Sequence, residues 1–200
     1  MASSIVDRKL DLLYLIYFCL HIPVLFLMDL QSLYPASLTP SFLTAIKNYH
    51  IANYNDLFFV SPPIYFNLFV WLECLIHLPV SFWAIGGLLR GGCYGWVWWE
   101  CRKREKGKEK AGMLRTKLLP YDSPRIPLIL LPYALETFLT TLVCMHEYVY
   151  WPIPRYQKVD LTKLYGPYIL LSIVMGIDMF IRLWHIVSAS TAAKKGKKNI

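Results

Sequence analysis

Apolar residues fill four long runs of the chain, and most charged residues lie between those runs. A helix of about 20 mostly apolar residues crosses a hydrocarbon core of roughly 30 Å while satisfying its own backbone hydrogen bonds. The four predicted spans are residues 10–30, 64–89, 126–148 and 164–187. The pattern therefore predicts an all-α fold, a bundle of four transmembrane helices in one domain of residues 1–190, followed by a tail of residues 191–200.

A shorter helical pattern occurs between the first two spans. Thr39 and Pro40 are typical of a helix start, as the N-cap and the first-turn residue. Apolar residues follow at helical spacing: Phe42, Leu43, Ile46 and Tyr49. We expect a short amphipathic helix here that lies across one end of the bundle.

Composition excludes a soluble globular protein. Hydrophobic residues make up 56% of the sequence and charged residues 17%, whereas soluble domains average roughly 45–50% and about 25%. The net charge is +8, but the basic residues are concentrated between and beyond the spans. We therefore interpret this charge as a membrane-topology signal, and we expect no nucleic-acid partner.

The distribution of Lys and Arg predicts the orientation. Of 21 such residues, 16 lie before the first span, between spans two and three, or in the tail. Basic segments stay cytosolic, so both termini are predicted to be cytosolic and the short helix to be lumenal. The basic run Arg102–Lys110 then lies on the cytosolic side, where it can rest on anionic lipid headgroups.

The tail carries a further signal. Lys197 and Lys198 are the fourth and third residues from the C-terminus, which matches the dilysine motif that coat proteins read on cytosolic tails. The match predicts a multi-pass protein of the endoplasmic reticulum membrane. A plain stop-transfer cluster of lysines is the alternative interpretation.

Ionisable residues inside spans are the candidates for function, because a charge at the bilayer centre costs about 2.5–3.5 kcal/mol on insertion scales. Asp178 and Arg182 are spaced i,i+4 and predict an ion pair on one helix face. Glu136 lies in the middle of span three, either protonated and hydrogen-bonded or lining a cavity. The sequence predicts neither a metal site nor a cofactor.

Asp29 and Glu73 form the leading candidate site. Asp29 is near the lumenal end of span one, and Pro23 can kink that span towards Glu73 in span two. Two carboxyl groups that meet in an apolar place share one proton. The remaining negative charge suits an amine-bearing amphiphile with aromatic walls, and equally suits acid–base chemistry on a lipid; a purely structural carboxyl pair is the third possibility. His77 is four residues after Glu73 and is expected on the same face.

The sequence resembles a known family at these positions. Tyr17–Leu30 (YFCLHIPVLFLMDL), Asn55–Leu57 with Pro62 and Pro63, Glu73–Leu75 with Leu78 and Pro79, and Tyr165–Tyr168 resemble the sigma-2 receptor family of EXPERA-domain membrane proteins. The chain looks like a fungal member, of the group called efficient mitochondria targeting-associated proteins.

The resemblance implies a four-helix bundle of EXPERA type in the endoplasmic reticulum membrane, in contact with membrane lipids. It also implies a homodimer and a pocket for sterols or cationic amphiphiles. Asp29 matches the acid that pairs with a ligand amine, Glu73 the acid hydrogen-bonded to it, and Asp56 a lumenal acid that supports the site. The expected pocket walls are His21, Met28, Thr137 and Tyr168. His77 and Glu136 depart from the family pattern.

The predicted function is sterol or amphiphile binding, with a role in lipid handling or in targeting precursors to mitochondria. One alternative is a sterol double-bond isomerase that uses the same two acids, although the His-x-x-x-Glu spacing of that branch is missing, since His21 is followed by Leu25. The other is a membrane adaptor that acts through Arg102–Lys110. Whether the protein is an enzyme stays open at this point.

Overall fold

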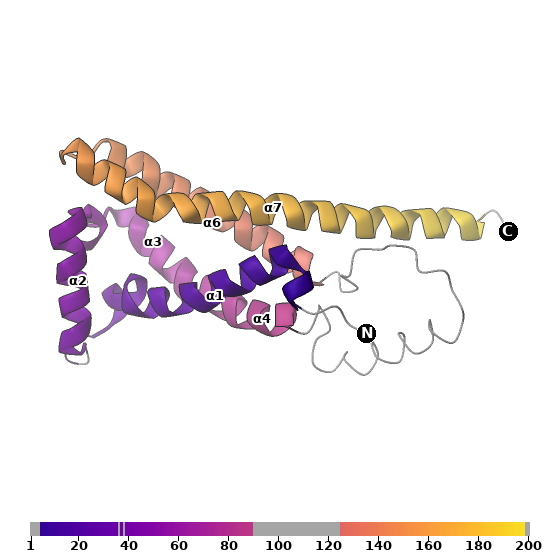
Figure 1. Ribbon diagram of the computed structural model, residues 1–200, viewed down its shortest axis with the longest axis horizontal. Coiled ribbons are helices and arrows are strands. Elements are labelled where there is room, and N and C mark those ends of the chain that lie inside the picture. The colour runs from indigo at the N-terminus through magenta and orange to yellow at the C-terminus, as the bar shows by residue number, and fades with distance from the viewer. Residues whose placement is uncertain (1–4, 36, 38, 90–124, 199–200) are drawn as a thin grey trace.

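The computed structural model describes residues 5–35, 37, 39–89 and 125–198. Within these residues every regular element is helical (Figure 1). Four segments are long and apolar enough to cross a membrane: Lys9–Leu33, Ile64–Leu89, Arg125–Val149 and Arg155–Ser188. The all-helical prediction and the four predicted spans are confirmed. The basic run Arg102–Lys110 falls outside the described residues.

The first span consists of α1 (Lys9–Leu27), preceded by the short turn η1 (Ile5–Asp7) and followed by the 3₁₀ turn η2 (Asp29–Leu33). The residues that α1 buries recur every three or four positions, which is the helical period: Asp11, Tyr14, Phe18, His21 and Leu25. Its other faces are apolar and exposed, as expected for a helix in lipid. The α-helix continues past Pro23, and Asp29 is the first residue of the turn that follows it.

The second span is interrupted in its middle. It consists of α3 (Ile64–Leu72), a π-helical turn η5 (Glu73–His77) and α4 (Leu78–Leu89). Pro79 explains the interruption, because proline has no N–H and its ring collides with the carbonyl of residue i−4 in a regular α-helix. In the wider turn, the Leu78 N–H bonds to the Glu73 carbonyl, five residues back. From the sequence we expected Glu73 and His77 on one face of an α-helix; instead they begin and end this π turn.

The third and fourth spans form an antiparallel pair. They are α6 (Arg125–Val149) and α7 (Arg155–Lys198), which lie side by side over most of α6 before α7 runs on beyond the bundle (Figure 1). A Cβ added to Gly176 of α7 would lie 3.8 Å from the Ala134 Cβ of α6. Small side chains at this point let the two helices pack closely.

The core draws on all four spans. Its buried residues are Tyr14, Phe18, Ala84, Leu88, Ile126, Leu130, Tyr133, Ala134, Met175 and Met179. A second cluster lies nearer the α6–α7 turn and consists of Phe58, Cys144, Tyr148, Trp151, Ile153 and Leu161. The two clusters leave the middle of the bundle to the polar and aromatic residues described below.

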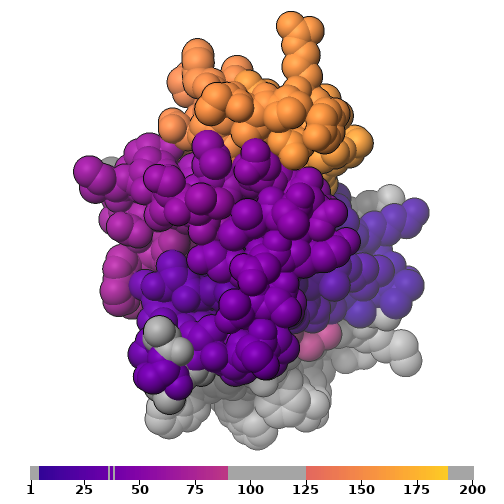
Figure 2. Space-filling view, turned by 90° about the vertical axis from the view of Figure 1, so that its left-hand side faces the viewer, coloured from indigo at the N-terminus to yellow at the C-terminus, as the bar shows by residue number. Residues whose placement is uncertain are grey.

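The short helix α2 (Ser41–Tyr54) lies across the end of the bundle, as the hydrophobic pattern predicted (Figures 1 and 2). The predicted N-cap was wrong. Pro40 occupies that position without a side-chain bond, and the Thr39 hydroxyl donates instead to the Pro35 carbonyl. Of the predicted apolar face only Leu43 is buried, whereas Phe42 and Tyr49 are 56% and 71% exposed. The apolar face of this helix therefore makes shallow contact with the bundle, chiefly through Leu43.

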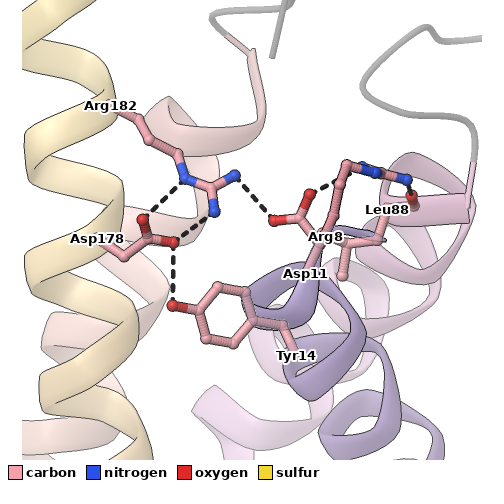
Figure 3. A network of polar contacts seen from close by, with 6 residues as sticks. All are labelled: Arg8, Asp11, Tyr14, Leu88, Asp178 and Arg182. Atoms are coloured by element: carbon pink, nitrogen blue, oxygen red, sulfur yellow. Dashed lines mark hydrogen bonds and ion pairs between the residues drawn. The ribbon is translucent and has the colours of Figure 1, made fainter. Parts of the chain in front are cut away.

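Charged residues join three helices at the opposite end of the bundle (Figure 3). The predicted Asp178–Arg182 pair is confirmed, with the Arg182 Nε 2.9 Å from Asp178 Oδ1. Arg182 also donates to Asp11 of α1 over 2.8 Å. The Tyr14 hydroxyl donates to Asp178 over 3.0 Å.

Arg8 extends this network to the second span. Its guanidinium donates to Asp11 and to the Leu88 carbonyl near the end of α4, each over 2.7 Å (Figure 3). That bond satisfies a carbonyl that the helix end would otherwise leave without a partner. The start of α1, the end of α4 and the middle of α7 therefore lie together at one end of the bundle.

Candidate functional site

Asp29 and Glu73 lie on two facing turns. The 3₁₀ turn η2, which begins with Asp29, packs against the π turn η5, which begins with Glu73. Among the described residues no hydrogen bond joins the two side chains. The structure thus brings the two predicted acids into the same region, at the η2–η5 contact, without a direct bond between them.

The π turn also positions His77. Its Nε2 is hydrogen-bonded to the Glu136 carboxylate on α6. His77 is buried, while Glu136 keeps part of its side chain exposed. The structure therefore shows Glu136 hydrogen-bonded to the second span. Such non-α turns recur at functional sites, because the extra residue re-aims the side chains around it.

Aromatic rings surround His21 in the middle of the bundle. The ring of Tyr17, four residues earlier on α1, stacks on it at 5.1 Å with an interplanar angle of 13°. His77 from η5 and Tyr168 from α7 each have their ring centroids 5.8 Å from that of His21. The Tyr17 hydroxyl is 3.0 Å from the Tyr133 hydroxyl of α6. Residues from α1, η5, α6 and α7 therefore form one continuous aromatic cluster.

A narrow crevice adjoins this cluster between α1, α6 and α7. It does not admit a water molecule in this packing. It is lined by Tyr17, Tyr133, Ala134, Thr137, Tyr168, Leu171, Ser172 and Met175. Thr137 and Tyr168, two of the predicted pocket residues, thus line the same crevice. Tyr168 also packs against the ring of His21, which links the crevice to the aromatic cluster.

The remaining predicted residues have different places. Met28 joins α1 to η2 and is partly exposed; it does not line the crevice. Asp56 is fully buried outside the spans and accepts hydrogen bonds from the Phe58 N–H, the Tyr165 hydroxyl and His50 Nε2, at 3.0, 3.1 and 3.2 Å. It therefore fastens α2, η4 (Leu57–Phe59) and α7 together.

The backbone before Asp56 explains its position. Asn55 ends α2 with φ 48°, a left-handed conformation that asparagine tolerates better than most residues. The chain turns sharply there, so that the next side chain caps η4 by accepting from the Phe58 N–H. This local geometry agrees with the cap expected of an acid in a turn.

Sequence reasoning missed Tyr17 and Tyr133 as site residues. Helical spacing could have predicted both, because residues four positions apart lie on the same helix face. Tyr17 precedes His21 by four residues, and Tyr133 precedes Thr137 by four. Their contact with each other was not readable, because it depends on the rotation of α1 and α6 about their own axes.

Comparison with known proteins identifies the family. A family model described as EXPERA (EXPanded EBP superfamily) matches residues 41–179. This chain belongs to the EXPERA family. The EXPERA match includes Glu73, His77 and Glu136, whereas His21 and Asp29 precede it.

Two individual relatives match a longer part of the chain than the family model does. "Sigma intracellular receptor 2" of Xenopus tropicalis is 24% identical over 185 residues, which is 88% of this chain and 91% of that protein. The human protein of the same name is 22% identical over 191 residues, 90% of this chain and 92% of its own length. The resemblance to the sigma-2 receptor branch of the EXPERA family is thereby confirmed.

Proposed function

We propose that this EXPERA protein binds sterols or cationic amphiphiles in an intramembrane pocket built around Asp29 and Glu73. The observation that carries the proposal is the contact of η2 with η5, which sets two acids beside an aromatic cluster inside a membrane-spanning bundle. The relatives named as intracellular receptors support a ligand-binding role.

The chemistry follows from the two acids and their surroundings. One net negative charge between the carboxyl groups attracts a ligand amine, and the ring of Tyr168 adds cation–π attraction. The apolar body of the ligand lies along the crevice between α1, α6 and α7. Because the crevice is too narrow for water as packed, ligand entry requires its side chains to separate.

We further propose the endoplasmic reticulum membrane as the location, with lumenal α2, cytosolic termini and a dilysine signal at Lys197 and Lys198 that binds coat proteins. The protein acts there as a homodimer, in contact with membrane lipids, in lipid handling or in mitochondrial precursor targeting. Support comes from the asymmetry of Lys and Arg along the chain and from the receptor-named relatives.

Binding of a cationic amphiphile to the purified full chain tests the central proposal. Asp29→Asn removes the charge with little change in shape, and a charge-assisted hydrogen bond is worth about 1.5–3 kcal/mol. We therefore expect affinity for a radiolabelled amine ligand to fall by about tenfold or more. Asp160→Asn is the matched control, because Asp160 lies on the exposed part of α7, paired with Lys163. Equal affinity in the wild type and Asp29→Asn would contradict the proposal.

The His77–Glu136 hydrogen bond favours a second candidate, a sterol double-bond isomerase. That reaction needs one group to protonate an alkene and another to remove a proton elsewhere, and a buried imidazole beside a carboxylate supplies such a pair. Expression in cells that lack sterol isomerase tests this candidate. Restored isomerised sterol that disappears with Glu136→Gln would favour the enzyme over the binder.

A further inference from the structure

The middle of the bundle contains polar atoms that the protein leaves without partners. Both ring nitrogens of His21, His77 Nδ1 and Glu136 Oε1 are buried and accept or donate no hydrogen bond within the described structure. Native proteins rarely leave buried polar atoms in this state, and lipid offers no replacement. The arrangement is therefore that of a binding site in which a ligand supplies the missing hydrogen-bond partners.

These atoms are gathered in one place. His21 is 5% exposed and faces His77 across 5.8 Å between ring centroids, while His77 is bonded to Glu136. Tyr17 and Tyr168 close two further sides of the His21 ring. A ligand atom that reaches His21 is therefore surrounded by aromatic rings and by unpartnered polar atoms from α1, η5 and α6.

The hydrogen-bonding groups around His21 determine which class of ligand fits. A neutral imidazole offers one donor nitrogen and one acceptor nitrogen. A hydroxyl group can both accept and donate, so it satisfies either nitrogen of His21, whereas an ammonium only donates. The Glu136 carboxylate disfavours an anionic guest by charge repulsion.

We propose that His21, supported by His77 and Glu136, is a binding site for the hydroxyl group of a neutral membrane alcohol of the sterol type. The inference rests on the proposed function for its pocket but adds a second polar contact to it. The apolar lining of the adjoining crevice, including Leu171 and Met175, takes the body of that alcohol.

The hydroxyl site is displaced from Asp29 along the first span. His21 and Asp29 are eight positions apart, and a helix rises about 1.5 Å per residue, so the two residues are on the order of 10 Å apart. A ligand with an amine and a hydroxyl at that separation contacts both sites. A neutral alcohol uses the His21 site alone.

Paired ligands test the hydroxyl site on the full chain in lipid nanodiscs. The probes are cholesterol and its 3-methyl ether, which has the same apolar body but cannot donate a hydrogen bond. The wild type is expected to bind cholesterol about tenfold more tightly than the ether. His21→Phe keeps an aromatic ring and removes both nitrogens, so it should abolish this preference. His21→Gln keeps a donor and an acceptor and should retain part of it.

Thermal unfolding without ligand shows whether these variants fold and whether His21 has only a structural role. Because His21→Phe removes two unpartnered buried atoms, we expect its ligand-free melting temperature to equal or exceed that of the wild type. Cholesterol should raise the melting temperature of the wild type more than that of the variant. If His21→Phe does not fold, the test rests on two other measurements. These are the preference of the wild type for cholesterol over its methyl ether and the reduction of that preference in His21→Gln.

The outcomes distinguish this inference from the proposed function. A wild type that binds alcohol and ether equally, or a His21→Phe variant that keeps the preference, overturns the hydroxyl site. An amine ligand that binds the wild type and Asp29→Asn equally overturns the acid site but leaves the hydroxyl site standing.

Discussion

Individual polar side chains in this protein fall into two groups, those that the chain itself satisfies and those that it does not. Asp56 is the clearest member of the first group, with three donors from its own chain. His21 is the clearest member of the second. Satisfied buried groups maintain structure, whereas unsatisfied ones are available to a ligand. This contrast favours a structural role for Asp56 and agrees with the binding role that we propose for His21.

Asp56→Ala should destabilise the protein strongly. It leaves the Phe58 N–H, the Tyr165 hydroxyl and His50 without their acceptor in a buried place, which costs about 3 kcal/mol or more in the free energy of unfolding. A lower melting temperature in detergent, relative to Asp160→Ala, checks this expectation. If Asp56→Ala had the melting temperature of the wild type but no longer bound the ligand, Asp56 would belong to the pocket instead.

At the scale of helices and turns, charged pairs hold α1, α4 and α7 together at one end of the bundle (Figure 3). Helical spacing predicted the Asp178–Arg182 pair, because both residues lie on one helix. No spacing rule predicts that Arg182 also reaches Asp11, since that bond depends on how two helices pack. Pairs within a helix are readable from sequence, and pairs between helices are not.

Arg182→Leu tests this network. Removing the guanidinium leaves Asp178 with an uncompensated negative charge in a partly buried setting, while Asp11 keeps only Arg8 as its cationic partner. Breaking a buried pair in this way costs about 3–5 kcal/mol. The matched control is Lys163→Leu, because Lys163 is 72% exposed in its pair with Asp160 and an exposed pair contributes about 0–1 kcal/mol. Equal melting temperatures for the two variants would show that the network contributes little to stability.

The π turn provides a test at the same scale. Pro79→Ala restores a backbone N–H and removes the ring that prevents a regular α-helix around Leu75. We expect η5 to become α-helical, which re-aims Glu73 and His77 and lowers affinity for the amine ligand by about tenfold, with the melting temperature unchanged or higher. A variant with unaltered affinity would show that the turn does not shape the pocket.

At the scale of the whole molecule, length and hydropathy were sufficient to predict four spans and a helix across one end. They were not sufficient for the site. Asp29 and Glu73 were paired by residue type and depth, but the partner of His77 is Glu136 on another span, a contact set by helix rotation and by a turn that the hydrophobic pattern does not reveal. The prediction that Thr39 is the N-cap of α2 was wrong for a local reason, because Pro40 occupies the N-cap position.

Cysteine labelling tests the predicted orientation. In a background without the native cysteines, Gly196→Cys in the tail should react with a membrane-impermeant maleimide only after the plasma membrane is permeabilised. Asn53→Cys on α2 should react only after the endoplasmic reticulum membrane is also permeabilised. Reaction of both at the first step would place α2 and the tail on the same side and contradict the topology.

The length of α7 has a mechanical consequence. At about 1.5 Å per residue, the 30 residues from Tyr168 at the crevice to Lys198 make a rod of about 45 Å. A tilt of about 5° at the crevice would displace the far end of that rod by about 4 Å. The fourth span therefore acts as a lever arm, because any tilt moves the end that carries Lys197 and Lys198 farther than the residues at the crevice.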